Sequence, residues 1–194
     1  RLGACVQTSW GMTELSPLGT MSPPLARKRS AAISGRPAVG VDFLLTDADG
    51  QPLPQQRDVE GHLRVRGASA IERYFGDERP ATDADGWFNT GDLARIDRDG
   101  NLIITGRAKD LIKSGGEWIN PAEIEAIIGR LPEVSLAAVI GRSDAKWGER
   151  PILVVETREQ RSISDDTMLA ALQGQIATWW MPDAVIRVPN MPLA

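Results

Sequence analysis

The chain has 194 residues, of which 42% are hydrophobic and 25% charged, so it can bury a core of ordinary globular composition. Its net charge of −4 argues against general nucleic-acid binding, because that activity needs a clustered basic surface. Cys5 is the single cysteine, which excludes an internal disulfide and a cysteine metal site and fits a reducing, cytoplasmic compartment. No apolar run approaches the roughly 18 residues that a membrane helix needs.

The first half of the chain is predicted to be rich in β-strands. Residues 1–20 read as a strand end and a glycine-rich loop, and residues 21–36 as a connector. The apolar run at 41–45 and the alternating pattern at 62–66 each predict a strand. An Asp-Gly turn inside residues 93–105 predicts a hairpin.

After Gly106 the pattern changes to mixed α/β. Apolar residues recur with helical spacing from Ile124 to Leu131, and Asn120 and Pro121 are suited to the N-cap and first position of that helix. The other predicted elements are strands over residues 134–140, 152–155 and 185–188, and a second helix marked by Met168, Leu172, Ile176 and Trp179 and ended by Pro182.

A Trp-Gly-Met-Thr-Glu segment at residues 10–14 combines a carboxylate, a hydroxyl and a glycine. Glu14 offers the oxygen ligand that Mg²⁺ prefers. The Thr13 hydroxyl and the backbone beside Gly11 can donate to a phosphate. Taken alone the segment is a weak signal, because Thr-Glu after a glycine is more often a turn that leads into a helix cap.

Three further segments lie close together in residues 86–125. Asp92 ends a Thr-Gly-Asp turn, and an ionised aspartate can accept two hydrogen bonds from a cis-diol, although Gly-Asp is also common where a strand begins. Arg107, in a Gly-Arg-Ala-Lys-Asp string, offers a charged donor fork to ribose or phosphate. A Lys-Ser-Gly-Gly-Glu-Trp loop follows at 113–118, and its glycines permit close backbone approach to a ligand.

Together these segments resemble the acyl-adenylate-forming (AMP-binding) superfamily, in particular its fatty-acyl and medium-chain acyl-CoA synthetases. The resemblance implies a mixed fold: a β-barrel-like C-terminal part of the large adenylation domain in residues 1–105, a hinge at 106–110, and a small α/β C-terminal domain in 111–194. The family's phosphate-binding loop and terminal catalytic lysine have no counterpart in the sequence. The chain is therefore expected to be a C-terminal fragment, nearly inactive by itself.

The resemblance also implies roles for individual residues. In the first half-reaction, Trp10 lies beside adenine, Gly11 and Thr13 contact phosphate, Glu14 holds Mg²⁺, and Asp92 and Arg107 bind ribose or phosphate. Thr13, Glu14 and Lys113 are the catalytic candidates, and Lys109 is the hinge residue. The loop residues that face the coenzyme A arm in the second half-reaction are Gly115, Gly116, Glu117 and Trp118.

The predicted function is an ATP- and Mg²⁺-dependent carboxylate–CoA ligase that acts on a fatty or related medium-chain acid and releases pyrophosphate and AMP. The loop at 113–118 favours CoA as the acceptor, because the resembling peptide-synthetase domains favour Lys-Ile-Arg-Gly at this place. Two alternatives remain: an adenylation domain that loads a carrier protein, and a non-catalytic nucleotide- or acyl-binding derivative. Two roles are open for Trp147 and Arg150: contact with the CoA nucleotide, or packing and surface pairing. The expected partners are the acid and CoA, without nucleic acid, and the sequence carries no signal for oligomeric state.

Overall fold

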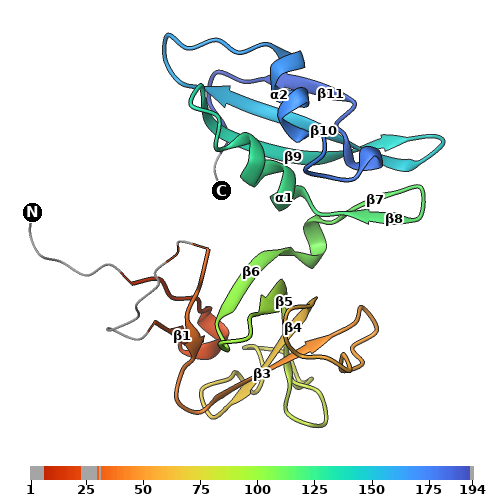
Figure 1. The fold of residues 1–194 in the computed structure, drawn as a ribbon. Coiled ribbons are helices and arrows are strands. Elements are labelled where there is room, and N and C mark those ends of the chain that lie inside the picture. The colour runs from red at the N-terminus through yellow and green to blue at the C-terminus, as the bar shows by residue number, and fades with distance from the viewer. Residues whose placement is uncertain (1–6, 23–29, 31, 193–194) are drawn as a thin grey trace, which may run out of the picture. The chain divides into compact units, whose positions relative to one another are not determined.

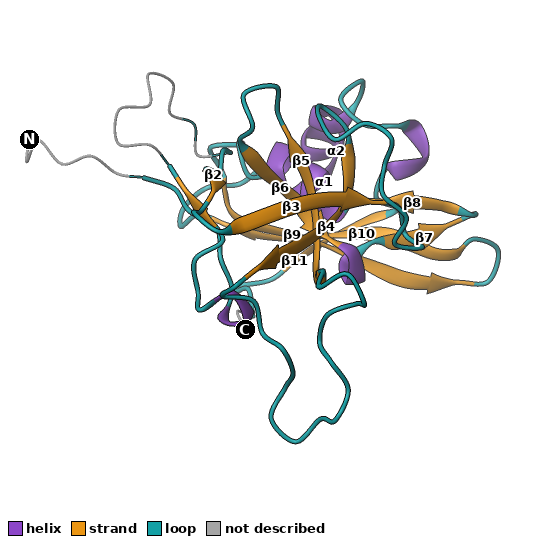
Figure 2. Cartoon of the chain, turned by 90° about the horizontal axis from the view of Figure 1, so that it is seen from below, coloured by secondary structure: helices purple, strands orange, loops and turns teal. Residues whose placement is uncertain are grey.

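The computed structural model describes residues 7–22, 30 and 32–192, and the chain divides into two compact units, Arg1–Ala108 and Lys109–Ala194. Strands and loops make up most of both units, and the helices are short (Figure 2). The predicted mixed fold is confirmed. The division falls within residues 106–110, whose role as a hinge stays a prediction. Within the described ranges, no helix is long and apolar enough to cross a membrane.

The first unit is built on a four-stranded antiparallel sheet in chain order (Figure 1). All four strands predicted from the sequence are present. Among the described residues no ladder joins the first strand to the fourth, so the sheet is open rather than a closed barrel. The strands are β3 (Val41–Thr46), β4 (Glu60–Gly67), β5 (Phe88–Ile96) and β6 (Leu102–Arg107).

One face of this sheet carries the core of the first unit. In β4 the buried positions alternate with half-buried ones, and Leu63 and Val65 are fully buried. They pack with Leu45, Leu102 and Leu15. Alternation places every second side chain on one face of a strand, so the sequence pattern alone fixes which face is buried.

The segment before the sheet is more structured than the predicted loop. It contains a 3₁₀ turn, η1 (Thr13–Leu15), and a short strand β1 (Thr20–Met21) that pairs with β2 (Arg36–Pro37). Leu15, which is 1% exposed, anchors the turn in the core. Cys5 and much of the predicted connector, residues 23–29 and 31, lie outside the described residues.

The second unit has a five-stranded sheet covered by two helices, α1 (Pro121–Ile128) and α2 (Asp165–Leu172). The longest ladder is antiparallel and joins β9 (Val134–Asp144) to β10 (Gly148–Thr157). The other strands of this sheet are β7 (Ile112–Ser114), β8 (Glu117–Ile119) and β11 (Ala184–Arg187), and β11 is parallel to β10. Two short 3₁₀ turns complete the chain, η2 (Ala108–Asp110) and η3 (Thr178–Trp180).

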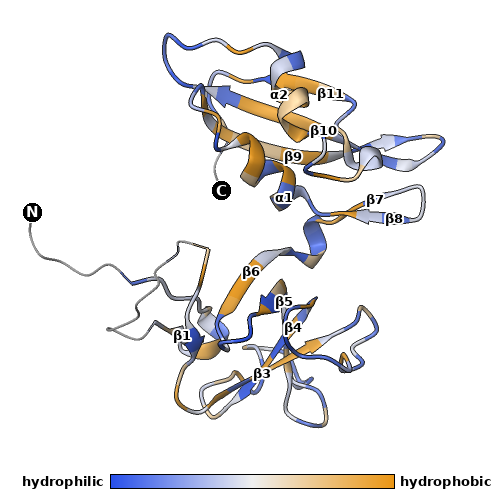
Figure 3. Ribbon diagram, viewed as in Figure 1, coloured by the Kyte–Doolittle hydropathy of each residue, from blue (hydrophilic) through white to orange (hydrophobic). Residues whose placement is uncertain are grey.

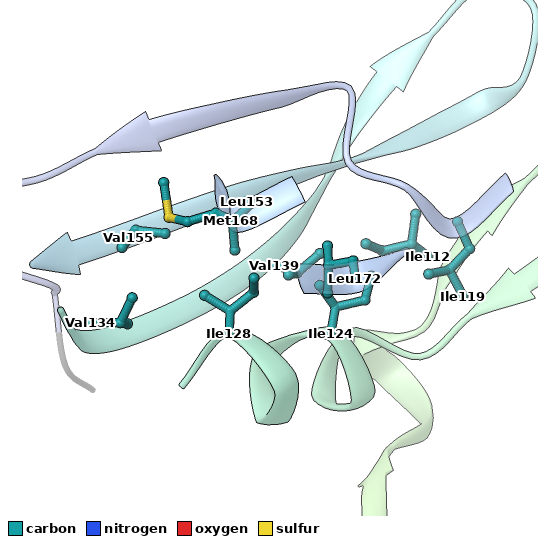
Figure 4. Close-up of a cluster of buried hydrophobic side chains, with 10 residues drawn as sticks. All are labelled: Ile112, Ile119, Ile124, Ile128, Val134, Val139, Leu153, Val155, Met168 and Leu172. Atoms are coloured by element: carbon teal, nitrogen blue, oxygen red, sulfur yellow. The ribbon is translucent and has the colours of Figure 1, made fainter. Parts of the chain in front are cut away.

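The core of the second unit lies between the helices and the sheet. Ile124 and Ile128 of α1 and Met168 and Leu172 of α2 are all 0% exposed and point toward β9 and β10 (Figure 4). Hydrophobic residues run along the same strands (Figure 3). The predicted N-cap is confirmed, because the side chain of Asn120 accepts a hydrogen bond from the backbone N–H of Ala122 at 3.2 Å.

The second helix is shorter than the sequence pattern predicts. It ends at Leu172, because Gly174 adopts a left-handed φ of +72° that a helix cannot continue through. Ile176 lies in the following turn and packs on the core. Trp179 belongs to the separate turn η3 and is 56% exposed, so the prediction that the helix extends through Trp179 is wrong.

Candidate functional site

The Thr-Gly-Asp turn is held rigidly within β5. Asp92 is 3% exposed. Its backbone N–H donates to the Thr90 hydroxyl oxygen at 3.0 Å, and that hydroxyl donates to the carbonyl of Leu63 at 2.8 Å. Gly91, between them, has a φ of +74°, which a side chain would disfavour. The backbone at this buried residue is thus fixed by contacts within β5 and to the neighbouring strand β4.

Two side chains from distant parts of the sequence converge on this carboxylate. The indole N–H of Trp10 donates to Asp92 Oδ2 at 2.9 Å. The Nε of Arg107, in β6 beside β5, lies 2.7 Å from Asp92 Oδ1. Each carboxylate oxygen has a second lone pair, so the group can still accept from a ligand. The structure therefore brings together three of the residues that the sequence singles out.

Burial and these two donors act on Asp92 in opposite directions. Burial raises the pKa of the carboxyl, because it disfavours the charged form. The Trp10 hydrogen bond and the Arg107 charge lower the pKa, but burial is the larger effect and the pKa stays above the ordinary range. The site keeps a desolvated carboxylate that a pair of donors only partly compensates.

Trp10 itself is closely fixed. Its backbone N–H donates to the Thr20 hydroxyl oxygen at 2.6 Å. Its ring meets Phe43 edge to face, with the ring centroids 6.1 Å apart. A Cβ at Gly19 would lie 2.4 Å from the indole ring, so only glycine leaves room for it. The indole–carboxylate hydrogen bond is absent from the sequence prediction, which places the ring beside adenine.

Glu14 and Thr13 lie on η1, in the same segment as Trp10. The Tyr74 hydroxyl donates to Glu14 Oε1 at 2.9 Å, and Ile71 donates its backbone N–H to the Glu14 carbonyl at 2.8 Å. The hydrogen bond to Glu14 is the largest cause of a raised Tyr74 pKa. At Gly11 a Cβ would come within 2.0 Å of the Pro17 carbonyl oxygen, so this glycine permits a close backbone crossing.

The Lys-Ser-Gly-Gly-Glu-Trp segment forms a hairpin, β7–β8, that the sequence prediction treats as a loop. Lys113 stands opposite Trp118 in the ladder, and its Nζ lies 5.4 Å from the centre of the exposed indole ring. Gly115 and Gly116 make the turn with φ values of +60° and +92°. A Gly-Gly pair between two short segments is a hairpin signal, so the sequence contained a local pattern that predicts this turn.

A cleft of about 450 Å³ adjoins this hairpin within the second unit. One wall is the exposed ring of Trp147, which lies so close to Gly115 that a Cβ there would be 2.7 Å from the ring. Asp144 holds Trp147 by accepting its backbone N–H at 2.8 Å. The lining residues are Ser114, Gly115, Glu117, Asp144, Trp147, Arg150, Trp179 and Asp183.

Arg150 uses all five of its donors inside the second unit. Its Nε and one Nη donate to Asp183 Oδ1 at 3.0 and 2.8 Å. Its other hydrogen bonds go to the Ser114 hydroxyl and to the carbonyls of Trp179 and Met181. Arg150 is thus paired with Asp183 and hydrogen-bonded within its own unit, and no feature of the sequence predicted this set of partners.

The site residues therefore form two groups, one in each unit. Trp10, Asp92 and Arg107 contact one another in the first unit, where Gly11, Thr13 and Glu14 also lie. Lys113, Glu117, Trp118 and the two glycines share the hairpin of the second unit. Lys109 is an exposed residue of η2. Within the parts of the chain that the structure describes, no group of three or more His, Cys, Asp or Glu side chains could hold a metal ion.

Comparison with known proteins gives consistent matches. Residues 123–194 match the family described as the AMP-binding enzyme C-terminal domain. The chain is 42% identical to a 3-methylmercaptopropionyl-CoA ligase from Ruegeria pomeroyi, over 100% of the chain and 38% of that protein. It is 41% identical to a medium-chain-fatty-acid–CoA ligase from Ectopseudomonas oleovorans, over 98% of the chain and 36% of that protein.

A solved structure matches the fold. The crystal structure of ATP-bound MatB from Rhodopseudomonas palustris superposes with a TM-score of 0.89 at 36% identity, over 98% of this chain and 38% of that one. The chain thus spans less than two fifths of the length of these relatives. Residues 123–194 therefore carry the AMP-binding enzyme C-terminal domain, and the chain as a whole is similar to one stretch of acyl-CoA ligases.

Proposed function

We propose that the protein to which this chain belongs is an ATP-dependent carboxylate–CoA ligase that forms AMP. The observation that carries the proposal is the buried Asp92 carboxylate, which lies between Trp10 and Arg107 and has acceptor capacity left for a diol. Relatives named as CoA ligases, and a structural relative solved with ATP, support the same reading.

In the first half-reaction an oxygen of the substrate carboxylate attacks the α-phosphorus of ATP and pyrophosphate leaves. Catalysis of such a step depends mainly on positioning and charge neutralisation. We assign Asp92 to the ribose 2′- and 3′-hydroxyl groups, which would donate to it. The Arg107 side chain is 56% exposed, so its remaining N–H groups are accessible to ribose or phosphate oxygens. Thr13 and the backbone at Gly11 are assigned to the α-phosphate.

Glu14 fits the donor set of a magnesium site. Mg²⁺ is usually held by one or two carboxylates together with substrate phosphates, so a single carboxylate is sufficient on the protein side. One Glu14 oxygen is oriented by the Tyr74 hydroxyl, which leaves the other for the metal. When bound, Mg²⁺ would neutralise charge on the phosphates. Glu14 would fix its position relative to η1.

In the second half-reaction the CoA sulfur attacks the acyl carbonyl carbon of the adenylate, the C–O bond to AMP breaks, and the thiol proton is lost to solvent or a base. We assign this step to the β7–β8 hairpin of the second unit. Lys113 supplies a cation for the adenylate, and Gly115 and Gly116 let the backbone approach the pantetheine arm. The Trp147 face and the adjoining cleft are assigned to CoA.

The domain arrangement belongs to the same proposal. Residues 1–105 would be the end of the large adenylation domain, residues 106–110 the hinge, and residues 111–194 the small C-terminal domain. Lys109 would be the residue whose torsions change between the two half-reactions. The substrate is proposed to be a fatty or related medium-chain acid, a class that one relative's name also states.

The test is AMP release by the intact protein with ATP, Mg²⁺ and a panel of carboxylic acids, each with and without CoA. The panel should include medium-chain fatty acids and 3-methylmercaptopropionate. Release that requires both an acid and CoA supports the proposal. Turnover that depends on a carrier-protein thiol in place of CoA would contradict the ligase assignment, and an absence of acid-dependent AMP release would contradict enzymatic function.

A further inference from the structure

We propose that Trp10 is a positioning residue for ribose recognition: its indole N–H fixes the plane of the Asp92 carboxylate for the 2′- and 3′-hydroxyl groups of a bound adenine nucleotide. This inference rests on the proposed function, because it assumes that Asp92 binds ribose. It adds a role for a side chain that does not itself touch the sugar, and it makes the indole nitrogen, rather than the ring face, the informative atom.

The Asp92 carboxylate is held by a donor at each of its two oxygens. The χ2 torsion of aspartate is broad, so an unrestrained carboxylate can rotate about it. In this protein one donor lies at each oxygen, Trp10 Nε1 at 2.9 Å from Oδ2 and Arg107 Nε at 2.7 Å from Oδ1. Together they define the plane of the group. A diol that must donate to both oxygens needs that plane fixed in advance.

The two donors to Asp92, Arg107 and Trp10, differ in exposure and in how they are packed. The Arg107 side chain is 56% exposed and has five donors, so it can exchange partners when a nucleotide arrives. Trp10 is half-buried, with its ring against Phe43 and over Gly19. Its single N–H donates to Asp92, and these ring contacts hold it there. Trp10 is therefore the donor that keeps the Asp92 carboxylate in place whether or not Arg107 remains on it.

The Trp10 hydrogen bond also favours the charged form of the Asp92 carboxyl. Ribose hydroxyl groups donate to an ionised carboxylate, and burial of Asp92 opposes ionisation. The Trp10 hydrogen bond is the larger of the two interactions that lower the pKa of this carboxyl. A neutral donor does this without adding a charge that would compete with Arg107 for phosphate.

The test is nucleotide binding to the intact protein, measured by isothermal titration calorimetry with ATP and with 3′-deoxy-ATP. The variant Trp10→Phe keeps an aromatic ring and removes the N–H. We expect the wild-type protein to prefer ATP over 3′-deoxy-ATP, and the variant to lose about tenfold of that preference, since hydrogen bonds to charged groups carry effects of this size. If Trp10 had a purely structural role, the Trp10→Phe variant would bind ATP and 3′-deoxy-ATP more weakly by the same factor.

The matched control is Phe43→Leu, which removes the edge contact to the Trp10 ring and keeps its N–H. It should preserve the preference for ATP. If Trp10→Phe does not fold, 3-benzothienylalanine at position 10 keeps the bicyclic shape with sulfur in place of the N–H, and the same loss of preference is expected. Full wild-type preference in either donor-less variant would overturn the inference while leaving the ligase proposal intact. Failure of the wild-type protein to bind any adenine nucleotide would overturn both.

Discussion

A buried carboxylate in the first unit, Asp92, and a largely buried guanidinium in the second, Arg150, are compensated to different degrees. In the first unit, Asp92 is 3% exposed and burial raises the pKa of its carboxyl group. Its two donors leave lone pairs on the carboxylate oxygens free to accept from a ligand. In the second, Arg150 has all five donors satisfied within the unit, and the cleft beside it is walled by the exposed rings of Trp147 and Trp179. A carboxylate with spare acceptor capacity is suited to gripping a ligand, whereas a saturated guanidinium is suited to holding a wall in place.

We infer from this difference that the first unit recognises its ligand by hydrogen bonds, whereas the second unit provides the shape of a binding surface. Compensation of a buried charge by only two donors costs stability, a cost that is usual at functional sites. Complete compensation of Arg150 connects β10 with the η3 turn and the residues that follow it. We infer that the first unit contributes specific hydrogen bonds to the ligand, and that the second contributes glycine backbone, aromatic faces and the Lys113 cation.

The largest expected effect comes from a substitution in the backbone that links the two units. Lys109→Pro fixes φ and removes a backbone donor in η2, so a torsional change at this residue would be blocked. We expect acid-dependent pyrophosphate–ATP exchange to continue while acyl-CoA formation falls to the limit of detection. Lys109→Ala is the control and should retain both activities. Equal loss of both half-reactions in Lys109→Pro would argue against a hinge.

The next largest effect concerns the stability of the second unit. Arg150→Met leaves Asp183 and two carbonyl groups without their donor, which should lower the free energy of unfolding by about 2–3 kcal/mol. Urea denaturation followed by tryptophan fluorescence measures this change. Arg142→Met is the matched control, because Arg142 is exposed and stands opposite Arg150 in the β9–β10 ladder. Equal losses in the two variants would contradict a structural role specific to Arg150.

A smaller effect distinguishes the two glycines of the hairpin. Both have positive φ, so alanine strains the turn at either position. Only at Gly115 would the new Cβ collide with Trp147, at 2.7 Å, and displace the wall of the cleft. We expect Gly115→Ala to raise the KM for CoA about tenfold more than Gly116→Ala, a difference of about 1.4 kcal/mol. The same KM in both variants would exclude Trp147 from the CoA site.

The smallest effect is the titration of Asp92. Because burial raises its pKa, the folded protein binds this proton at pH values where the unfolded chain has released it. This group therefore lowers stability as pH rises from the unfolded pKa through the folded one, and the loss is constant above. Selective ¹³C labelling of aspartate, with Asp92→Asn for assignment, measures the pKa by NMR. Arg107→Gln should raise it further, and a decrease would contradict the proposed role of the guanidinium.

Much of the fold follows from patterns in the sequence. The alternation in β4 and the helical face of α1 arise from local periodicity, and Asn120 caps its helix through contacts within three residues. The predicted length of α2 is wrong because the apolar spacing continues to Trp179, whereas Gly174 ends the helix. Periodicity reports which residues face a core, and it does not distinguish a helix from a turn that packs on the same core.

The candidate site was only partly predictable for the same reason. Asp92 and Arg107 stand out by motif, but the hydrogen bond from Trp10 joins residues 82 positions apart. The Tyr74 contact with Glu14 spans 60 positions in the sequence. Arg150 donates to backbone carbonyl groups, and residue types in the sequence do not indicate which carbonyls these are. Such contacts are set by the packing of whole elements, which a single sequence does not express as a local pattern.

The central claim is that Asp92 grips the ribose of ATP, and acid-dependent pyrophosphate–ATP exchange in the intact protein tests it most directly. Asp92→Asn keeps the shape of the side chain but replaces one acceptor oxygen with an NH2 group, so it removes the charge and one acceptor for the ribose hydroxyl groups. We predict that exchange at low ATP falls about a hundredfold, as expected when two hydrogen bonds to a charged group are weakened. Wild-type exchange and an unchanged KM for ATP in this variant would contradict the account.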